Sequence, residues 1–236
     1  MSADPQSTEN RALRPQGLSP AASSARPAIS GLGEDAALAL LHTPEVTAEA
    51  LSQLARDQVV AKSRKVLFAL VAHPRTPRHI SIPLLRRMFT FDLVQVTLTP
   101  AVAADVKRSA EEQIILRLES LPAGQKISLA RRASGRIAGQ LLQNPDVRVI
   151  TPALENPQLT ESLIIQALVK KSAPAVLFKL ASEHAKWSLR REIQIALLKS
   201  GKISPQRVAQ FAKNFSPDFL RRILRGSPAA PPSIGN

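Results

Sequence analysis

The chain has 236 residues, 44% of them hydrophobic, so it can bury a sizeable core as one domain or one continuous array. It has no cysteine, which excludes disulfides, thiolate catalysis and the commonest structural zinc sites. Lys and Arg number 32 against 18 Asp and Glu, a formal net charge of +14, which favours anionic partners.

The two ends of the chain differ from its middle in composition. Segment 1–30 mixes Ser, Ala, Pro, Gln and Arg without helical periodicity, a composition that cannot offset its ordering entropy. We therefore expect a disordered tail over 1–30, a single domain over 31–226, and a second disordered tail over 227–236. No apolar region follows a basic N-terminal stretch, and no long apolar run occurs, so we expect a cytoplasmic protein without a signal peptide or membrane span.

A short phrase recurs after the first tail: a His or Asn, usually a Pro, one variable residue, an aliphatic or small residue, then Thr, Ser or Pro. An apolar helical stretch follows each copy. The copies read His42-Thr43-Pro44-Glu45-Val46-Thr47, with one insertion, His73-Pro74-Arg75-Thr76-Pro77, Asn156-Pro157-Gln158-Leu159-Thr160, His184-Ala185-Lys186-Trp187-Ser188, and a partial Asn144-Pro145-Asp146-Val147.

The spacing of the copies indicates repeated helical units. With Thr99-Pro100 included, the aligned positions 44, 74, 100, 157 and 185 are separated by 30, 26, 57 and 28 residues. A period near 30 suits one helix pair. Because 57 is close to two units, we expect a degenerate unit near Leu121-Pro122.

Apolar spacing predicts a helix after each punctuation point. The helices are expected, with boundary errors of about 2–4 residues, over 33–42, 47–57, 60–72, 79–97, 102–119, 124–142, 146–154, 160–170, 173–183, 188–200, 204–213 and 216–225.

Proline and hydroxyl side chains mark several of the predicted helix starts. Thr160, Ser188, Ser204 and Ser216 are candidate N-caps, since a side-chain oxygen at that position accepts a first-turn N–H. Proline is tolerated at a helix start but costs about 3 kcal/mol in the interior. We therefore expect Pro83 to begin a helix after a short turn rather than to kink a long one.

The recurring phrase followed by an amphipathic helix resembles the leucine-rich-repeat variant and the wider HEAT/armadillo-like helical-repeat group. The resemblance covers roughly residues 34–225, and the region 100–143 departs from it. It implies an all-α fold, a right-handed α-solenoid of short helix pairs, which binds partners on one surface and usually has no catalytic activity.

Positive charge is concentrated in the second half of the chain. Residues 1–124 carry 14 basic and 12 acidic side chains, whereas residues 125–236 carry 18 and 6. Many of these cations form doublets, and doublets on equivalent helices of a stack would line up as a stripe that attracts polyanions. The predicted partner-binding residues are Arg131, Arg132, Arg136, Lys170, Lys171, Lys186, Arg190, Arg191, Arg221 and Arg222.

These features predict a non-enzymatic scaffold that docks an acidic protein partner on its basic C-terminal surface. One alternative is sequence-nonspecific nucleic-acid binding through phosphate contacts. A simpler interpretation is that Lys and Arg only solvate surface helices. No cofactor, metal or small-molecule substrate is evident from the sequence.

Three other patterns favour structural roles. His42, His73 and His184 share their repeat position with Asn144 and Asn156, which indicates a polar side chain that bonds local backbone in a turn rather than a metal ligand. Trp187 occupies an aliphatic position and is expected to pack in the core. Gly135 and Gly139 place small residues four apart, which allows a close helix approach. Arg131-Arg132 before Ser134 resembles a basic-directed phosphorylation site, but Ser134 is expected to lie mid-helix.

A distant alternative is a DNA glycosylase, because certain glycosylases for alkylated purines are built from HEAT-like helices and are basic. That comparison rests on fold and charge alone. Such an enzyme needs aromatic side chains and a carboxylate facing the nucleotide. The candidate carboxylates, by elimination, are Asp146, Glu183 and Asp218.

Overall fold

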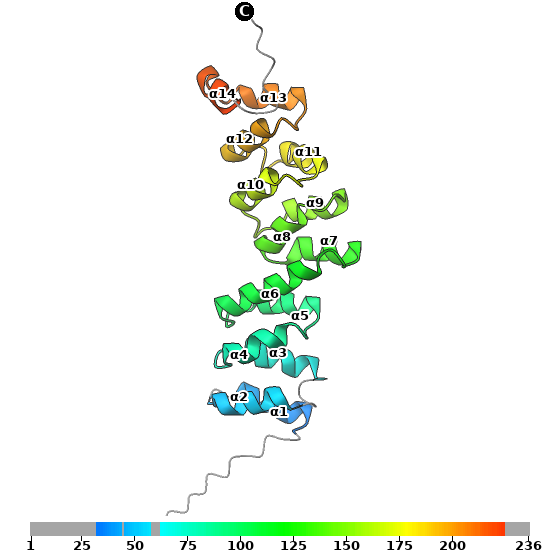
Figure 1. Ribbon diagram of the computed structural model, residues 1–236, viewed down its shortest axis with the longest axis vertical. Helices are drawn as coiled ribbons and strands as arrows, with labels where there is room; N and C mark the ends of the chain where they lie inside the picture. Colours follow the sequence, from blue (N-terminus) through cyan, green and yellow to red (C-terminus); the bar gives the residue numbers. More distant parts are fainter. Residues whose placement is uncertain (1–31, 44, 58–61, 225–236) are drawn as a thin grey trace, which may run out of the picture.

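The computed structural model describes residues 32–43, 45–57 and 62–224, and the regular structure in these ranges is helical: fourteen α-helices and a 3-10 position at Lys62 (Figure 1). The predicted all-α class is therefore confirmed for this part of the chain. The predicted tails, 1–30 and 227–236, lie outside the described residues.

The fourteen helices of the described ranges alternate between two layers. The first layer holds α1 (Glu34–His42), α3 (Arg64–Ala72), α5 (Thr90–Leu98), α7 (Ala123–Arg132), α9 (Val147–Leu154), α11 (Ala175–Glu183) and α13 (Pro205–Ala212). The second layer holds α2 (Ala48–Arg56), α4 (Arg78–Leu85), α6 (Ala104–Arg117), α8 (Gly135–Leu141), α10 (Glu161–Val169), α12 (Arg191–Ser200) and α14 (Pro217–Leu224).

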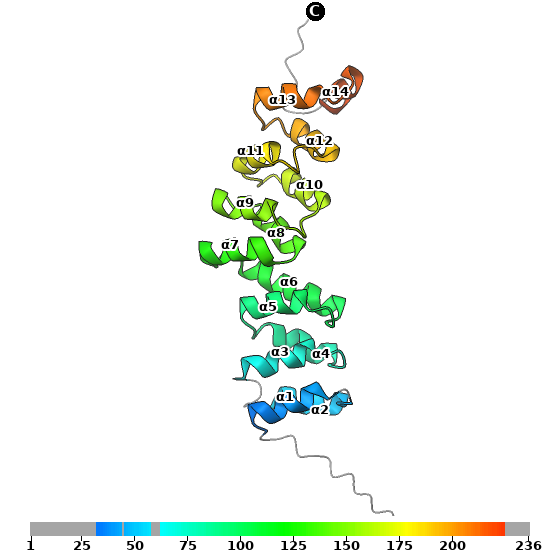
Figure 2. The same ribbon diagram turned by 180° about the vertical axis from the view of Figure 1, so that it is seen from behind.

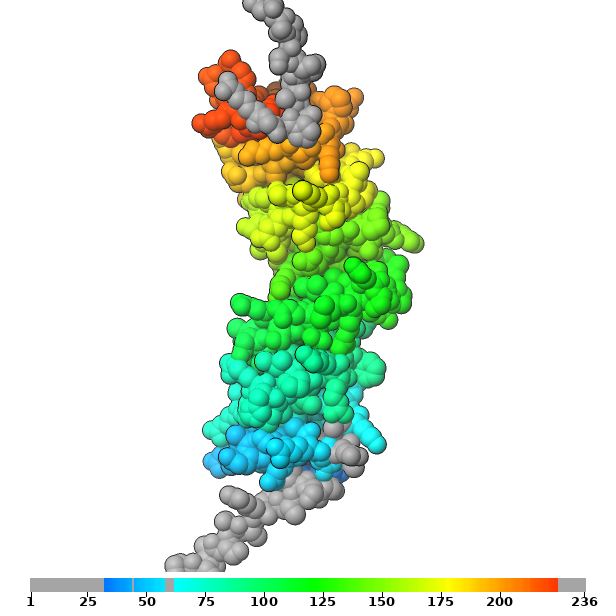
Figure 3. All heavy atoms as spheres, viewed as in Figure 1, coloured from blue at the N-terminus to red at the C-terminus, as the bar shows by residue number. Residues whose placement is uncertain are grey.

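Helices contact neighbours in their own layer and in the other layer, as α5 does with α6. In the first layer α1 contacts α3, α7 contacts α9, and α9 contacts α11; in the second, α8 contacts α10, α10 contacts α12, and α12 contacts α14. Figures 1 and 2 show an elongated stack with α1 and α2 at one end and α13 and α14 at the other. Figure 3 shows one face of this stack with all heavy atoms drawn.

The recurring His or Asn makes the same local hydrogen bond in four copies of the phrase. Its side chain accepts a hydrogen bond from the backbone N–H two residues later, which holds the turn and confirms the predicted contact with local backbone. The bonds join His73 Nδ1 to Arg75 N at 3.2 Å, Asn144 Oδ1 to Asp146 N at 2.9 Å, Asn156 Oδ1 to Gln158 N at 2.8 Å, and His184 Nδ1 to Lys186 N at 3.1 Å.

Loops that lead from a first-layer helix to the next second-layer helix lie along one edge of the stack, here called the turn edge. Two side chains tie these loops to the preceding unit. Asn156 Nδ2 donates to the carbonyls of Ala130 and Ala133 at 2.7 and 3.0 Å, and Trp187 Nε1 donates to the carbonyl of Leu154 at 2.7 Å. These bonds satisfy carbonyls that a helix end leaves without partners. Trp187 is only 2% exposed, which confirms its predicted core position.

The predicted helix 124–142 is wrong, because the chain breaks between α7 and α8 at Ala133 and Ser134. This break is the turn of the degenerate unit, whereas Leu121-Pro122 stands before α7. Ser134 is therefore the N-cap residue of α8 rather than a mid-helix residue, and its hydroxyl donates to the Glu111 carboxylate.

Gly135 and Gly139 allow α8 to approach the following unit, as predicted. A Cβ atom built on Gly135 would lie 2.8 Å from the carbonyl carbon of Gln158 and closer still to its oxygen. One built on Gly139 would meet Leu163 of α10 at 3.4 Å, an ordinary van der Waals contact. The close approach therefore depends most on Gly135.

The predicted helix 79–97 is also two helices, since α4 ends at Leu85 and α5 begins at Thr90. Arg117, at the end of α6, donates to the carbonyls of Met88 and Arg86 at 2.7 and 3.0 Å. These bonds provide donor partners for carbonyl groups of the irregular segment between the two helices.

The expectation that Pro83 begins a helix is wrong. Pro83 lies inside α4, near the end of that helix. The missing N–H removes one bond, to the carbonyl of His79. Because both residues are exposed, the His79 carbonyl is open to solvent, and this reduces the free-energy cost of the missing hydrogen bond.

The predicted caps are confirmed at Ser204 and Ser216, whose hydroxyls accept first-turn N–H groups at 3.4 and 3.3 Å. Thr160 is the N-cap residue of α10 but makes no side-chain cap bond. Ser188 is not a cap, because α12 begins only at Arg191. The side-chain amide of Gln194 donates to the Ser188 carbonyl at 2.7 Å and stabilises the turns that precede α12.

Candidate binding groove

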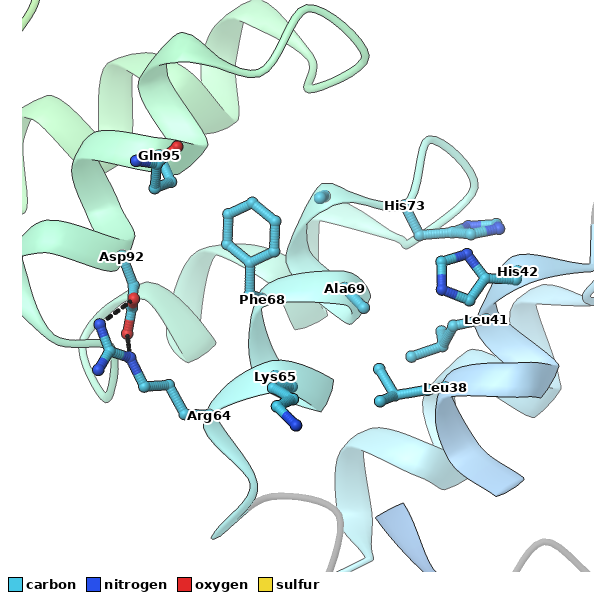
Figure 4. A pocket seen from close by; sticks show the side chains of 11 residues that line it. Leu38, Leu41, His42, Arg64, Lys65, Phe68, Ala69, His73, Asp92 and Gln95 are labelled. Atoms are coloured by element: carbon cyan, nitrogen blue, oxygen red, sulfur yellow. Dashed lines mark hydrogen bonds and ion pairs between the residues drawn. The ribbon is translucent and has the colours of Figure 1, made fainter. Parts of the chain in front are cut away.

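Two grooves on the stack differ in whether the cations that line them form ion pairs. The first, about 800 Å³, crosses α1, α3 and α5 (Figure 4). Its apolar lining includes Leu38, Leu41 and Phe68, and Figure 4 shows Phe68 between an ion pair on one side and two histidines on the other.

The cations of this first groove are already paired. Arg64 Nε and Nη2 each lie 2.6 Å from a carboxylate oxygen of Asp92, and Lys65 Nζ lies 3.4 Å from Glu34 Oε1. The hydrogen bond to Asp92 raises the pKa of the Arg64 guanidinium above its ordinary value, with the carboxylate charge adding to the effect. The N-terminal groove is therefore close to neutral.

The second groove, about 730 Å³, lies between α10 and α12 in the second layer. Its apolar lining comes from both helices and from α11 beneath, through Ile165, Leu168, Val169, Phe178, Ile195 and Ala196. Its charged lining consists of Lys170, Lys171, Lys199 and Lys202, with Glu192 as its one carboxylate. We call this the α10–α12 groove.

The four lysines meet because α10 and α12 run in the same direction and end side by side. Lys170 is the C-cap residue of α10, and Lys199 lies in the last turn of α12. Gly201 then adopts a left-handed conformation, φ 64°, which turns the chain so that Lys202 also lines the groove. Cations are favoured at these helix ends, where the carbonyl groups carry partial negative charge.

Two lysines have fixed neighbours that leave their charge available. Lys170 Nζ donates to Gln140 Oε1 of α8 at 3.1 Å, and Lys202 Nζ lies 4.8 Å from the centroid of the Phe178 ring. Lys170, Lys171 and Lys202 form no ion pair with any residue of the described ranges. The groove thus joins an apolar floor to a cationic end.

A neighbouring groove of about 560 Å³ lies on the other side of α12, against α14. Arg191 and Arg222 stand over the Phe219 ring, with guanidinium carbons 5.4 and 5.3 Å from its centroid, and Arg191 is 5.1 Å from that of Phe215. Such stacking holds a guanidinium in place while leaving its N–H edge open. Glu192, Ile195 and Lys199 line both grooves, so the two are continuous across α12.

The structure brings together only part of the predicted stripe. Lys170 and Lys171 line the α10–α12 groove, and Arg191 and Arg222 line the groove next to it. Four others are at the turn edge, on the far side of the stack from the lysine end. These four are Arg131 and Arg132 at the end of α7, and Lys186 and Arg190 in the loop before α12.

The two remaining predicted residues are engaged in ion pairs. Arg136 contacts Glu111 at 3.4 Å and Glu112 at 3.7 Å, and Arg221 contacts Asp218 at 2.8 Å. Their charges are partly neutralised, so they add less to either surface.

Lys199 and Lys202 line the groove but are not among the residues predicted from the sequence. They do not form a doublet, the pattern that Lys170 and Lys171 show in the sequence. Lys199 does lie about one repeat period after Lys170, and that spacing is the signal that could have found it.

The three carboxylates of the glycosylase alternative lie on separate helices. Asp146 caps α9 and contacts Arg148 at 2.9 Å, and these hydrogen bonds hold its pKa below the ordinary value. Glu183 is exposed at the end of α11, and Asp218 pairs with Arg221 in α14. The structure does not gather them around one cavity.

The turn histidines favour the neutral form. Burial lowers the pKa of His73 and of His184. The charge of Arg75 lowers the pKa of His73 further, whereas for His184 the nearby Glu155 opposes the effect of burial and Lys186 adds to it. Within the described ranges, no three His, Asp or Glu side chains are grouped so that they could hold a metal ion. None of the helices in these ranges has the length and apolar character needed to cross a membrane.

Comparisons of the chain with protein-family models, with curated proteins and with solved structures found no match. The geometry of the grooves is therefore the basis for a functional proposal.

Proposed function

We propose that the protein is a non-enzymatic helical-repeat scaffold, a right-handed α-solenoid of the HEAT/armadillo type, that docks an acidic protein partner in the α10–α12 groove. The observation that carries this proposal is that the groove combines an apolar floor with four lysines, whereas Glu192 is the one carboxylate in its lining. Alternation of first-layer and second-layer helices along the stack supports the repeat architecture.

The apolar floor favours a protein over a nucleic acid as the ligand. Filling it requires apolar side chains, which a peptide segment supplies and a phosphodiester backbone does not. Bases would need an exposed aromatic surface for stacking. Trp187 is 2% exposed and Phe178 1%, so neither ring is such a surface. Phe219 of the adjoining groove and its neighbour Phe215 are half-buried and lie against the guanidinium groups of Arg191 and Arg222.

The lysine end of the groove would then select acidic segments and guide their approach. Exposed ion pairs contribute only about 0.2–1 kcal/mol each, so the apolar contacts must provide most of the affinity. Charge complementarity mainly raises the association rate and excludes basic partners. We expect binding to weaken with salt without being abolished.

A second candidate function is sequence-nonspecific nucleic-acid binding, which the turn edge favours. Arg131, Arg132, Lys186 and Arg190 are exposed there, and none of them lines either groove beside α12. Phosphate contacts need only such exposed cations.

Two variants with equal loss of charge separate these functions. In each, four cations become glutamine, so that the net charge falls equally and only the position differs. The groove variant is K170Q/K171Q/K199Q/K202Q, and the edge variant is R131Q/R132Q/K186Q/R190Q.

The probes are a fluorescein-labelled acidic amphipathic peptide and labelled random-sequence DNA and RNA, followed by fluorescence anisotropy across a salt series. The proposal predicts that the peptide loses about tenfold or more in affinity with the groove variant and little with the edge variant. Equal losses would mean that net charge alone attracts the peptide. Nucleic acid that binds the wild type tightly and the edge variant weakly would favour the second candidate.

A further inference from the structure

The α10–α12 groove is electrically polarised along its length. Its four lysines gather where α10 and α12 end, whereas Glu192 stands in the first turn of α12, at the other end. Seven residues separate Glu192 from Lys199, which is about 10 Å along a helix. A ligand in the groove therefore meets four lysines at one end. At the other end it meets Glu192 beside Arg191 of the adjoining groove, so positive charge is concentrated at the lysine end.

The floor has the spacing of a helix-binding surface. Ile165 and Leu168 are three residues apart on α10, and Ile195 faces them from α12. Parallel neighbouring helices leave between them a furrow that accepts an amphipathic helix through residues repeated at three and four positions. Since α12 has ten residues, it offers about 15 Å, or nearly three turns, to such a ligand.

Helices prefer acidic residues at their N-terminal end and basic residues at their C-terminal end, and this preference fixes the direction in which a ligand helix would lie in the groove. Asp and Glu are favoured in the first turn of a helix and Lys and Arg in the last, because of the partial charges at its ends. In α12 itself, Glu192 is in the first turn and Lys199 in the last. A ligand helix with this order has its acidic first turn beside the lysines only when it runs antiparallel to α12.

We propose that the α10–α12 groove receives an amphipathic helix with an acidic first turn, antiparallel to α10 and α12, with the acidic turn at the lysine end. This inference rests on the proposed function and specifies the class and direction of the partner. In this orientation, basic residues in the last turn of the ligand face Glu192. The dipoles of the ligand and of α12 are also opposed, which is the favourable arrangement for adjacent helices.

Two synthetic peptides of identical composition test the direction. Both are about 15 residues long, which is enough for helix formation, and both are acetylated and amidated to remove terminal charges. Their apolar residues occupy the same positions. Three glutamates fill the first turn and three lysines the last turn in one peptide, and the order is reversed in the other.

Affinity for the full chain is measured by fluorescence anisotropy, and orientation by a benzophenone cross-linker placed at either end of the peptide. The peptide with the acidic first turn is expected to bind about tenfold more tightly than the reversed one, since three exposed charge contacts change sign. Its N-terminal cross-linker should label the segment around Lys202, and its C-terminal cross-linker the segment around Glu192.

The variant Glu192→Lys is the control for polarity, because it makes both ends of the groove positive at an exposed position. It should still bind an acidic peptide, but the preference for one charge order should fall to about twofold or less. Equal affinities of the two peptides for the wild type, or cross-links in the reverse order, would overturn the inferred direction and leave the proposed function standing. Failure of both peptides to bind, or full binding of both to the groove variant, would overturn the proposed function itself.

Discussion

Replacement of Gly135 by alanine tests the close approach between α8 and the following unit. The added methyl group would lie 2.8 Å from the Gln158 carbonyl carbon, and the obstacle is backbone rather than a flexible side-chain end. The turn before α8 or the loop before α10 must then shift. Overpacking of a close-packed site costs about 1–3 kcal/mol. Because Gly135 is the first residue of α8, the gain in helix propensity, at most about 1 kcal/mol in a helix interior, is small here.

Urea titration followed by far-UV circular dichroism measures this cost. With a slope of about 3 kcal/mol per M, the midpoint for Gly135→Ala should fall by about 0.3–1 M. Two matched changes are the controls: Gly139→Ala adds only an ordinary contact with Leu163, and Gly124→Ala meets nothing within 4 Å. Both should leave the midpoint unchanged or raise it slightly. If Gly135→Ala is as stable as Gly124→Ala, the inferred close approach between units is incorrect.

Three further predictions concern single contacts. Burial lowers the pKa of His184, an effect that Glu155 opposes and Lys186 adds to, so the folded state binds fewer protons than the unfolded state; stability should fall as the pH drops below about 6.5. His184→Asn keeps a turn acceptor and should reduce this pH dependence in urea titrations from pH 7.5 to 5.5; an unchanged profile would contradict it. Trp187→Phe leaves the buried Leu154 carbonyl without its donor and should cost about 1–3 kcal/mol in the same titration at pH 7.5, whereas no loss would show that the bond is dispensable. Ser204→Ala removes a helix cap and should lower stability by about 1 kcal/mol, measured by thermal unfolding; a midpoint equal to that of wild type would count against the cap.

Turns with strong local chemistry could be predicted from the sequence. Pro157 and Asn156 mark the turn after α9, and the Asn156 side chain bonds the backbone only two residues away. His184 does the same after α11. Such contacts are recognisable because every atom involved lies within a few residues.

The two helix breaks that the sequence did not indicate are stabilised from a distance. Arg117 binds the Met88 carbonyl across 29 positions, and Asn156 binds the Ala130 and Ala133 carbonyls across 26 and 23. Local propensity around each break is compatible with a continuous helix. Partners from the next unit therefore decide where the helix ends, and periodicity within one segment does not reveal them.

The candidate groove was predictable only in part for a related reason. Lys170 and Lys171 are conspicuous as a doublet, but Lys199 and Lys202 join them through the parallel packing of α10 and α12. Arg131 and Arg132 form an equally conspicuous doublet and lie at the turn edge. Charge along the chain indicates the attraction to anions, whereas the distribution of that charge over the surface depends on which helix ends meet.

Lysine footprinting tests most directly whether an acidic partner occupies the α10–α12 groove. The full chain is treated with an amine-reactive reagent, with and without a saturating acidic amphipathic peptide, and the modification of each lysine is quantified by mass spectrometry. The account predicts protection of Lys170, Lys199 and Lys202, with Lys186 and Lys213 unchanged. Protection of Lys186 without protection of the groove lysines, or equal protection of all five, would contradict it.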